Sequence, residues 1–298
     1  MNGHLDLLGI EVSRTARVAA VEDVPPAAAP RPISPPAADR PAPSRWRQPA
    51  LRLLSIVMAV LLWQLASAWR WHFIIDFKNI PTPAVVGRRL LGLLSTGAFY
   101  VHIAVSVKRI AISFALAAVF GVATGVLMGR SRLAIDLIMP HIETLRPIPA
   151  VAWVPLAILM FPTEESSIIY ITFLGAFFPI VLNTLHGVQQ TPETLVRVAQ
   201  SYGAKNLAIL RHVVLPAALP SISAGLAIGM GVAWFALLAG EIISGQYGIG
   251  YFTWNSYTLV QYPEIIVGML TIGLLGTSTT WLVRKACRPA LRWQEERD

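Results

Sequence analysis

The chain has 298 residues, of which 55% are hydrophobic and 13% charged, and its formal net charge is +8. Soluble globular proteins carry about 25% charged residues, so this composition excludes an ordinary soluble domain and indicates an integral membrane protein. The positive charge does not point to a nucleic-acid partner, because the excess arginine lies in loops and tails, as membrane topology requires. The single cysteine, Cys287, excludes a disulfide framework and a cysteine-based metal site.

The two ends of the chain differ from its middle. No apolar run precedes Ala50, so we expect no signal peptide. Residues 25–49 are rich in proline and alanine, a composition that buries too little apolar area to fold. We therefore expect residues 1–49 to form a disordered cytoplasmic tail, residues 50–285 to form one membrane domain, and residues 286–298 to form a basic cytoplasmic tail.

Six segments are long and apolar enough to cross a membrane, which takes about 20 residues. The pattern predicts an all-α polytopic membrane protein with six transmembrane helices. Between the first two spans, residues 81–100 predict a short amphipathic helix on the outer membrane surface. The six expected spans cover residues 50–69, 110–128, 133–161, 167–186, 222–243 and 265–283.

Orientation follows from the placement of lysine and arginine, which favour the cytoplasmic side. With the N-terminus inside, 17 of the 24 basic residues lie on inner loops and tails, six lie outside, and Arg146 lies in the third span. The outer group ends with Lys108 and Arg109, just before the second span. The sequence therefore predicts that both termini are cytoplasmic.

The third span carries three prolines, Pro147, Pro149 and Pro155, in an otherwise apolar stretch. Each proline removes a backbone donor and disturbs a helix. Broken backbone at membrane depth is tolerated only inside protein or beside a water-filled cavity, so we expect this span to face a pathway. Glu143 and Arg146, three residues apart, are either pathway residues or a pair that neutralise each other.

Glycines recur every four residues on two spans, at Gly121, Gly125 and Gly129 and again at Gly225 and Gly229. This spacing places them on one helix face and lets helix backbones approach closely. The sequence does not decide between packing within one chain and a subunit interface.

Residues 192–216 form a polar, basic insert between two apolar spans. Thr191 is expected to cap a helix that begins at Pro192, and Gly203 to end it. A second helical stretch over residues 206–214 is expected to end at Pro216. Physical reasoning alone permits this helix–glycine–helix elbow to dock on a soluble protein or to lie on anionic lipid.

The elbow resembles the "EAA" signature of bacterial ABC importer permeases, which is Glu-Ala-Ala, three residues, Gly, nine residues, Ile, one residue and Leu-Pro. The spacing matches without a gap. Arg197, Val198 and Val213 replace the Glu, the second-position Ala and the Ile of the signature. The positions in this register, with the neighbouring Ala204, are Arg197, Val198, Ala199, Gly203, Ala204, Val213, Leu215 and Pro216.

The segments LRPIPAVAWVPLAILMF, FLGAFFPIVLNTLHGV, RHVVLPAALPSISAGL and QYGIGY extend this resemblance to about residues 50–285. They resemble the nitrate, sulfonate, taurine and bicarbonate branch of these permeases, which have the MetI-like fold of type I importers. The resemblance implies the pore-forming subunit of an importer in a bacterial inner membrane, for a small anionic or organic solute. It further implies two ABC ATPase subunits that bind the elbow as a coupling helix, an extracytoplasmic solute-binding protein, and a second permease copy as a homodimer surrounded by lipid.

The resemblance implies no catalytic residue, metal or cofactor in this chain. The sequence has no P-loop, so ATP would be hydrolysed on another polypeptide. Candidate pathway residues are Glu143, Arg146, Pro147, Pro149 and Glu241. Arg146 would attract an anion, and Glu241, near the outer end of the fifth span, is either structural or part of a gate.

Two other classes of membrane protein, a secondary transporter and a membrane enzyme, are alternatives to an importer permease. A secondary transporter driven by an ion gradient would show intramembrane carboxylates and often an internal repeat. No convincing repeat is found, and Glu143 is the only carboxylate expected well inside a span. A membrane enzyme would need a cluster of catalytic or metal-binding groups. The histidines instead lie on separate segments, at His102, His141, His186 and His212.

Overall fold

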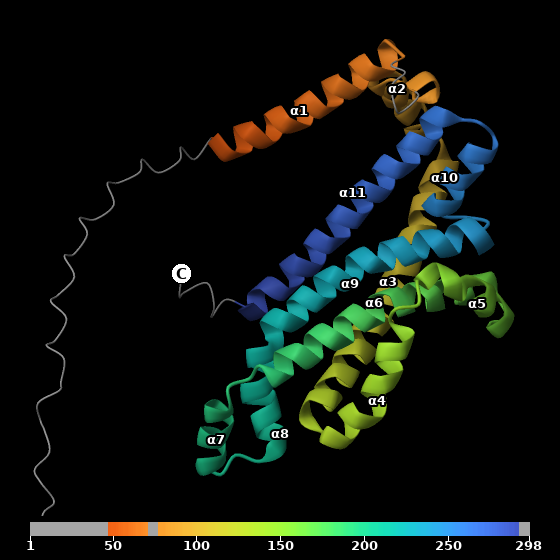
Figure 1. Cartoon of the computed structure of the whole chain (residues 1–298). Helices are drawn as coiled ribbons and strands as arrows, with labels where there is room; N and C mark the ends of the chain where they lie inside the picture. Colours follow the sequence, from red (N-terminus) through yellow and green to blue (C-terminus); the bar gives the residue numbers. More distant parts are fainter. Residues whose placement is uncertain (1–46, 71–76, 292–298) are drawn as a thin grey trace, which may run out of the picture. The chain divides into compact units, whose positions relative to one another are not determined.

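The computed structural model describes residues 47–70 and 77–291, and every regular element in these ranges is a helix (Figure 1). Of the tails expected at residues 1–49 and 286–298, residues 47–49 belong to the first helix, and residues 286–291 belong to the last helix and a 3-10 turn (η4, Arg288–Leu291). The remaining tail residues lie outside the described residues. The chain divides into two compact units between Ile56 and Val57, inside the first helix, and the account below concerns the second unit. The helices are α1 (Arg47–Ala68), α2 (Pro83–Leu94), α3 (Gly97–Arg130), α4 (Arg132–Leu145), α5 (Val154–Met160), α6 (Glu164–Gln189), α7 (Glu193–Ser201), α8 (Asn206–Ile209), α9 (Leu215–Ser244), α10 (Ile249–Thr258) and α11 (Tyr262–Cys287).

The second membrane helix is longer than the sequence predicts. We expected it to begin near Ile110, but α3 begins at Gly97 and contains 34 residues. At 1.5 Å per residue it is about 51 Å long, well beyond the roughly 30 Å hydrocarbon core. Lys108 and Arg109, which we assigned to an outer loop, therefore lie inside this helix, and Arg109 is buried. The amphipathic helix expected before it is present as α2.

Glycines of α3 fit against α6 of the same chain. A Cβ atom added at Gly121 would meet Ile180, one at Gly125 would lie 2.6 Å from the Thr184 Cβ, and one at Gly129 would meet Val188. These glycines therefore serve packing within the chain. Because each step of four residues along α3 matches a step of four along α6, the two helices run in the same direction.

The parallel course of α3 and α6 decides the number of membrane crossings. A chain that leaves the end of α3 must return along the whole bundle before α6 begins. The return is made by α4, a 3-10 turn (η2, Ala150–Trp153) and α5, two arms that meet at a 93° bend. The described residues contain five helices long and apolar enough to cross a membrane, and the broken span, counted as one, brings the number of candidate crossings to six.

The break in this span lies at two of the three prolines that we identified. Pro147 lies between α4 and η2, and Pro149 precedes the first residue of η2. Pro155 does not interrupt a helix. It lies in the first turn of α5, where its missing N–H has no helical partner to lose. Interrupted backbone in the third span is thus confirmed.

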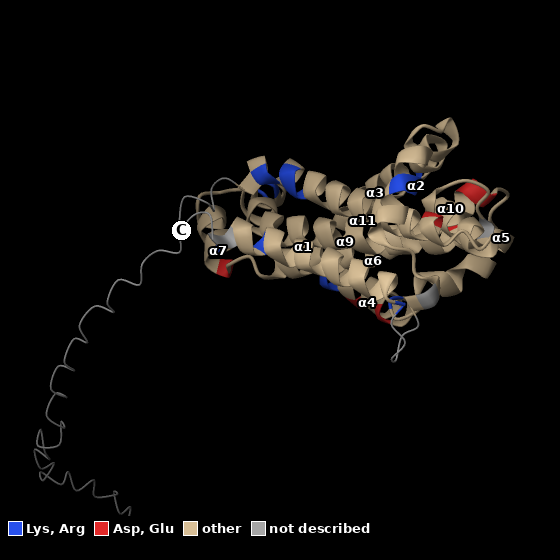
Figure 2. Cartoon of the chain, turned by 90° about the horizontal axis from the view of Figure 1, so that it is seen from above, with Lys and Arg blue, Asp and Glu red and all other residues tan. Residues whose placement is uncertain are grey.

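The core lies where α9 packs between α6 and α11 (Figure 1). Gly225 and Gly229 of α9 abut Asn183 and Ile180 of α6, and the Trp234 indole donates a 2.8 Å hydrogen bond to Thr279 on α11. In Figure 2 the middle of α9 and α11 carries neither blue nor red, so this part of the bundle is uncharged at its surface. Such a surface matches the hydrocarbon core of a membrane.

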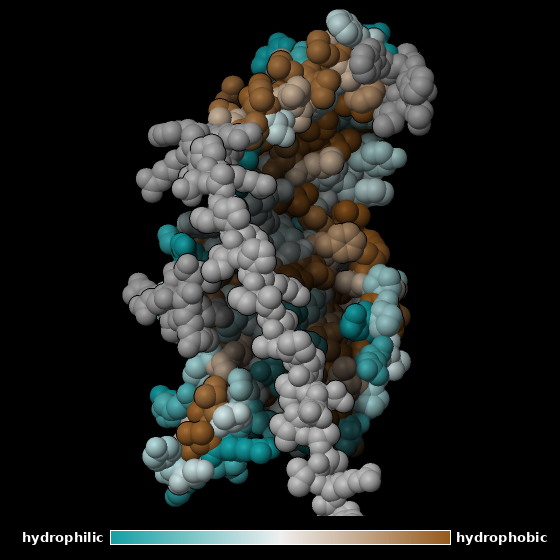
Figure 3. Space-filling view, turned by 60° about the vertical axis from the view of Figure 1, so that its left-hand side comes forward, coloured by the Kyte–Doolittle hydropathy of each residue, from teal (hydrophilic) through white to brown (hydrophobic). Residues whose placement is uncertain are grey.

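Different helices and turns lie at the two ends of the bundle. The α7 end holds α7, α8, the turn at Arg130 and the last turn of α11. The α10 end holds α10, the start of α6 and the end of α9. In Figure 3 the lower end, where α7 and α8 lie, is mostly hydrophilic, and the middle of the visible face is largely hydrophobic.

Candidate functional site

The elbow of residues 192–216 has a rigid turn at its centre. Gly203 has φ +79°, a conformation that side-chain-bearing residues rarely adopt. The Gly203 N–H bonds the Gln200 carbonyl at 2.8 Å and the Ala204 N–H bonds the Ala199 carbonyl at 3.0 Å. This pair of bonds is a Schellman motif, so the predicted end of the first elbow helix at Gly203 is confirmed.

The start of the elbow differs from our prediction. We expected Thr191 to cap α7 and Pro192 to be its first residue, but Pro192 occupies the cap position and the helix begins at Glu193. Among the described residues the Thr191 hydroxyl has no hydrogen-bond partner. Proline has no side-chain acceptor for a cap, so Glu193, in the first turn, is the group that complements the positive end of this helix.

We expected the second helix of the elbow to end at Pro216, but it does not. The helix continues from Asn206 through Pro216 to Ile243, a run of 38 residues. A π-helical turn at Leu210–Val214 directly precedes Pro216. The wider turn relieves the clash of the proline ring with the carbonyl four residues earlier, and this is how a helix passes a proline without breaking.

One side of the elbow is anchored and the other is exposed. Ala199, Ala204 and Val213 pack on a small core centred on Val188 and Val214. In contrast, Leu195 and Val198 are each 50% exposed, Tyr202 is 90% exposed and Leu207 is 75% exposed. Apolar side chains that protrude from a polar loop typically mark a surface that binds a partner.

The predicted coupling residues fall on both sides of this division. Val198, Ala199, Val213 and Pro216 line one shallow hollow on the elbow, together with Leu195, His212 and Ala217. Arg197, which replaces the acidic residue of the signature, points to solvent and pairs with Glu193 at 2.7 Å. This pair is exposed on both sides, so it contributes at most about 1 kcal/mol to stability.

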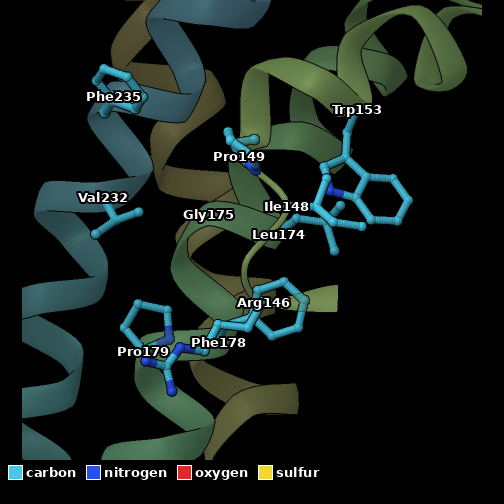
Figure 4. A pocket seen from close by; sticks show the side chains of 11 residues that line it. Arg146, Ile148, Pro149, Trp153, Leu174, Gly175, Phe178, Pro179, Val232 and Phe235 are labelled. Carbon is cyan, nitrogen blue, oxygen red and sulfur yellow. The ribbon is translucent and has the colours of Figure 1, made fainter. Parts of the chain in front are cut away.

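A pocket of about 250 Å³ lies beside the break between α4 and η2 (Figure 4). Arg146 and Pro149 line it from the broken span, Phe178 lines it from the middle of α6, and Val232 and Phe235 line it from α9. Two of the predicted pathway residues, Arg146 and Pro149, are thus together in one pocket. Pro147 and Glu143 belong to the same span but are not among the residues that line this pocket.

Glu143 and Arg146 do not form the ion pair that their spacing allowed. Both side chains are exposed, and no salt bridge joins them in the described part of the chain. Glu143 lies on α4, whereas Arg146 is the first residue after the helix and turns toward Phe178 and Pro179 (Figure 4). The guanidinium therefore has no carboxylate partner among the described residues.

Glu241, the other predicted pathway residue, does not line this pocket and lies in a buried polar cluster near the start of α10. Its side chain is fully buried in the last turn of α9. It accepts hydrogen bonds from Arg109 Nη1 at 3.1 Å, from Ser106 Oγ at 2.8 Å and from the Gly250 N–H at 2.9 Å. Arg109 also donates to Glu165 and to the Tyr247 carbonyl, at 2.8 and 2.7 Å.

The cluster fixes the loop between α9 and α10. Ser106 Oγ accepts the Ile249 N–H at 2.9 Å, and His102 Nδ1 accepts the Gly248 N–H at 3.2 Å. Gly248 has φ +122°, and a Cβ atom there would collide with the Glu241 carboxylate. The glycines in QYGIGY are therefore required because the loop backbone lies directly on this carboxylate.

Sequence reasoning assigned Arg109 to an outer loop and so missed it as a functional residue. It expected Glu241 near the outer end of the fifth span, and the residue does lie in the last turn of α9, but the full burial of its carboxylate was not predicted. The only available signal was the line of Ser106, Arg109 and Ser113 at helical spacing just before an apolar run. All three are buried on α3, so a helix starting about ten residues earlier would have placed them on its inner face.

Together, the long apolar helices, the broken third span and the helix–glycine–helix elbow define a polytopic membrane protein of the transport class, with an exposed apolar face on its elbow. Comparison with known proteins gives the family. The profile of the binding-protein-dependent transport system inner membrane component matches residues 117–285. The chain belongs to this family of ABC importer permeases.

Curated relatives cover most of the chain. A protein of Methanocaldococcus jannaschii, named as an ABC transporter permease, is 38% identical over 76% of this chain and 85% of its own length. A protein of Escherichia coli, named as a permease for aliphatic sulfonates transport, is 35% identical over 78% and 88%. The nitrate import permease protein NrtB of Synechocystis is 32% identical over 75% and 82%. The branch resemblance expected from the sequence is thus confirmed.

Proposed function

We propose that this chain forms the pore of an ATP-driven importer for a small anionic or organic solute of the sulfonate, taurine, nitrate or bicarbonate class. In this proposal the elbow of residues 192–216 couples the pore to a separate ATPase. The observation that carries it is the exposed apolar face of α7, formed by Leu195, Val198 and Tyr202 on a helix that the Schellman turn holds rigid. When a partner protein covers this apolar face, the apolar side chains are removed from water, which makes binding favourable in free energy.

The remaining partners follow from the same proposal. Two ATPase subunits would bind two elbows, one from each permease of a homodimer, and an extracytoplasmic binding protein would deliver the solute at the α10 end. The α7 end would then be cytoplasmic, and we propose the same side of the membrane for both termini. Support for this orientation comes from the basic residues of the α7 end, including Arg130, Lys205, Arg211 and Arg284, because cytoplasmic ends carry an excess of lysine and arginine.

Mild-detergent purification of the tagged chain from its native cells, with the co-purifying proteins identified, tests the proposal. We expect a P-loop ATPase in stoichiometric amount. A homodimer free of ATPase, under conditions that preserve known complexes, would contradict the proposal. It would favour a transporter driven by an ion gradient, with the elbow on the lipid surface.

A matched pair of variants locates the ATPase contact. Val198→Glu places a charge in the exposed apolar face, so we expect the ATPase to be lost while the chain still inserts and remains folded. Gln200→Glu adds the same charge two residues along α7, about 200° around the helix, and should retain the ATPase. Equal retention of the ATPase by both variants would place the contact elsewhere.

A further inference from the structure

The pocket beside the break in the third span combines one cation with walls that are otherwise apolar. It lies at the middle of α6, where Leu174, Gly175 and Phe178 face it, and against Val232 and Phe235 of α9 (Figure 4). The middle of a spanning helix lies near the centre of the hydrocarbon core. The pocket is therefore at a depth where a solute in transit must leave bulk water.

Among the described residues, Arg146 is the only charged one that lines this pocket. Its guanidinium has no carboxylate partner in the described ranges, and a charge held in a membrane segment without a partner is costly. A bound anion would remove that cost. A guanidinium presents a planar fork of donors that matches the oxygens of a carboxylate or sulfonate head group.

The rest of the lining cannot hydrate an ion. Apart from the Trp153 indole, no lining side chain carries a hydroxyl, amide or carboxyl group. The Trp153 Nε1 atom is itself buried and has no acceptor among the described residues. An inorganic oxyanion such as nitrate needs donors around most of its surface, and one guanidinium does not replace its hydration shell.

An anion with a charged head and an apolar body is complementary to a pocket that has one cation and apolar walls. Its head would bind Arg146 while its body covers Trp153, Phe178 and Phe235, three aromatic side chains around the same hollow. Each methylene removed from water contributes about 0.8 kcal/mol, which tightens binding about fourfold. The volume of about 250 Å³ is just below the roughly 300–1,000 Å³ of pockets for drug-sized ligands, so the body must be small.

We propose that this pocket is a transient binding site for a small organic anion, an alkyl or aryl sulfonate or carboxylate, and that it discriminates against inorganic oxyanions. The inference rests on the proposed function, because it assigns a solute class to that importer. It distinguishes between the two kinds of relative that the comparisons found, one named for aliphatic sulfonates and one named for nitrate.

Thermal unfolding of the purified full chain in lipid nanodiscs, measured against ligand concentration, tests the proposal. The probes are methane-, butane- and hexanesulfonate, benzenesulfonate and sodium nitrate at constant ionic strength. We expect affinity to rise with chain length by up to about fourfold per methylene. Nitrate should give no saturable shift at concentrations at which butanesulfonate saturates.

Three variants separate the pocket from unspecific uptake of sulfonates by lipid. Arg146→Gln should weaken butanesulfonate binding by at least about tenfold, because the charge-assisted bonds are lost. Arg88→Gln, an equal charge change on the exposed surface of α2, should leave it unchanged. Val232→Trp fills the hollow and should abolish binding of hexane- and benzenesulfonate.

Several outcomes would overturn the proposal: nitrate binding as tightly as butanesulfonate, affinity that does not depend on chain length, or full binding by Arg146→Gln. A lower dimer fraction in Arg146→Gln with unchanged ligand affinity would also overturn it, since Arg146 would then serve a subunit contact. The ATPase that co-purifies with the same preparations reports on the proposed function separately. A pocket that binds no organic anion in a chain that retains its ATPase would refute only this inference.

Discussion

Arg109 of α3 and Glu241 of α9 form a buried ion pair, 132 residues apart in sequence and 3.1 Å apart between Nη1 and Oε1. Both partners make further hydrogen bonds, Arg109 to Glu165 and the Tyr247 carbonyl, and Glu241 with Ser106 and Gly250. A buried charge is tolerated only when it is paired and hydrogen-bonded in this way. The pair therefore joins α3, the start of α6, the end of α9 and the start of α10 at one point.

Breaking this pair should strongly destabilise the chain. Glu241→Gln leaves the Arg109 guanidinium buried beside a neutral amide, with a cost of about 3–5 kcal/mol in the free energy of unfolding. Thermal unfolding of the purified chain in detergent measures the loss. As a control, Glu193→Gln breaks the exposed pair with Arg197 and should cost no more than about 1 kcal/mol. Similar unfolding temperatures for the two variants would show that the buried pair contributes no more to stability than the exposed pair.

The loop glycine that lies on Glu241 should not tolerate a side chain. Gly248→Ala places a methyl group against the carboxylate and forces alanine to φ +122°, which together cost at least about 1–3 kcal/mol. Gly273→Ala, on α11, meets nothing within 4 Å and should be neutral or slightly stabilising. Proteolysis between α9 and α10 measures the loop, and faster cleavage is expected in Gly248→Ala alone.

The contact between α3 and α6 should depend on the missing side chain at Gly125. Valine there would overlap Thr184 and the Val181 carbonyl, and overpacking of this kind costs about 1–3 kcal/mol. The control is Gly231→Val on α9, where an added Cβ has open space. Thermal unfolding compares the two, and an unchanged melting temperature for Gly125→Val would mean that the helices can separate without loss.

The turn of the elbow should be needed for coupling but not for folding. Proline fixes φ near −65° and has no N–H, so Gly203→Pro removes both the positive φ and the bond to Gln200. We expect the variant to insert in the membrane, to lose its ATPase and to transport nothing. Gly203→Ala keeps the N–H and costs about 1 kcal/mol of local strain, so it should retain part of both activities. Normal solute uptake by the Gly203→Pro variant would refute the proposal that the elbow couples the pore to an ATPase.

Composition and hydrophobic periodicity were enough to predict the helical class, the six crossings and the broken third span. They failed where a polar residue is buried by tertiary contacts. Arg109 looks like a loop residue because a charge ordinarily ends an apolar run, and nothing near it in sequence reveals Glu241 as its partner. The predicted helix end at Pro216 was wrong because a π turn at Leu210–Val214 lets the helix continue past the proline, and nothing in the local sequence predicts that turn.

Of the candidate site, the sequence predicted the glycine turn of the elbow, which the structure confirms. The pathway role of Arg146 stays a prediction. The sequence did not predict that Arg146 has no carboxylate partner among the described residues and makes no pair with Glu143, because a three-residue spacing shows only that two side chains can meet. It also did not show that Val198 is exposed while Ala199 is half-buried, since both are apolar and adjacent. Which of them faces outward is decided by the core beneath the elbow.

One continuous helix, from Asn206 to Ile243, connects the elbow to the buried ion pair of Arg109 and Glu241. Its 38 residues span about 57 Å at 1.5 Å per residue. If the elbow couples to an ATPase as proposed, a push beside Leu207 would be transmitted along this helix to Glu241, whose carboxylate accepts hydrogen bonds from Arg109, Ser106 and Gly250. The helix would then tilt about Glu241 or bend at its π turn.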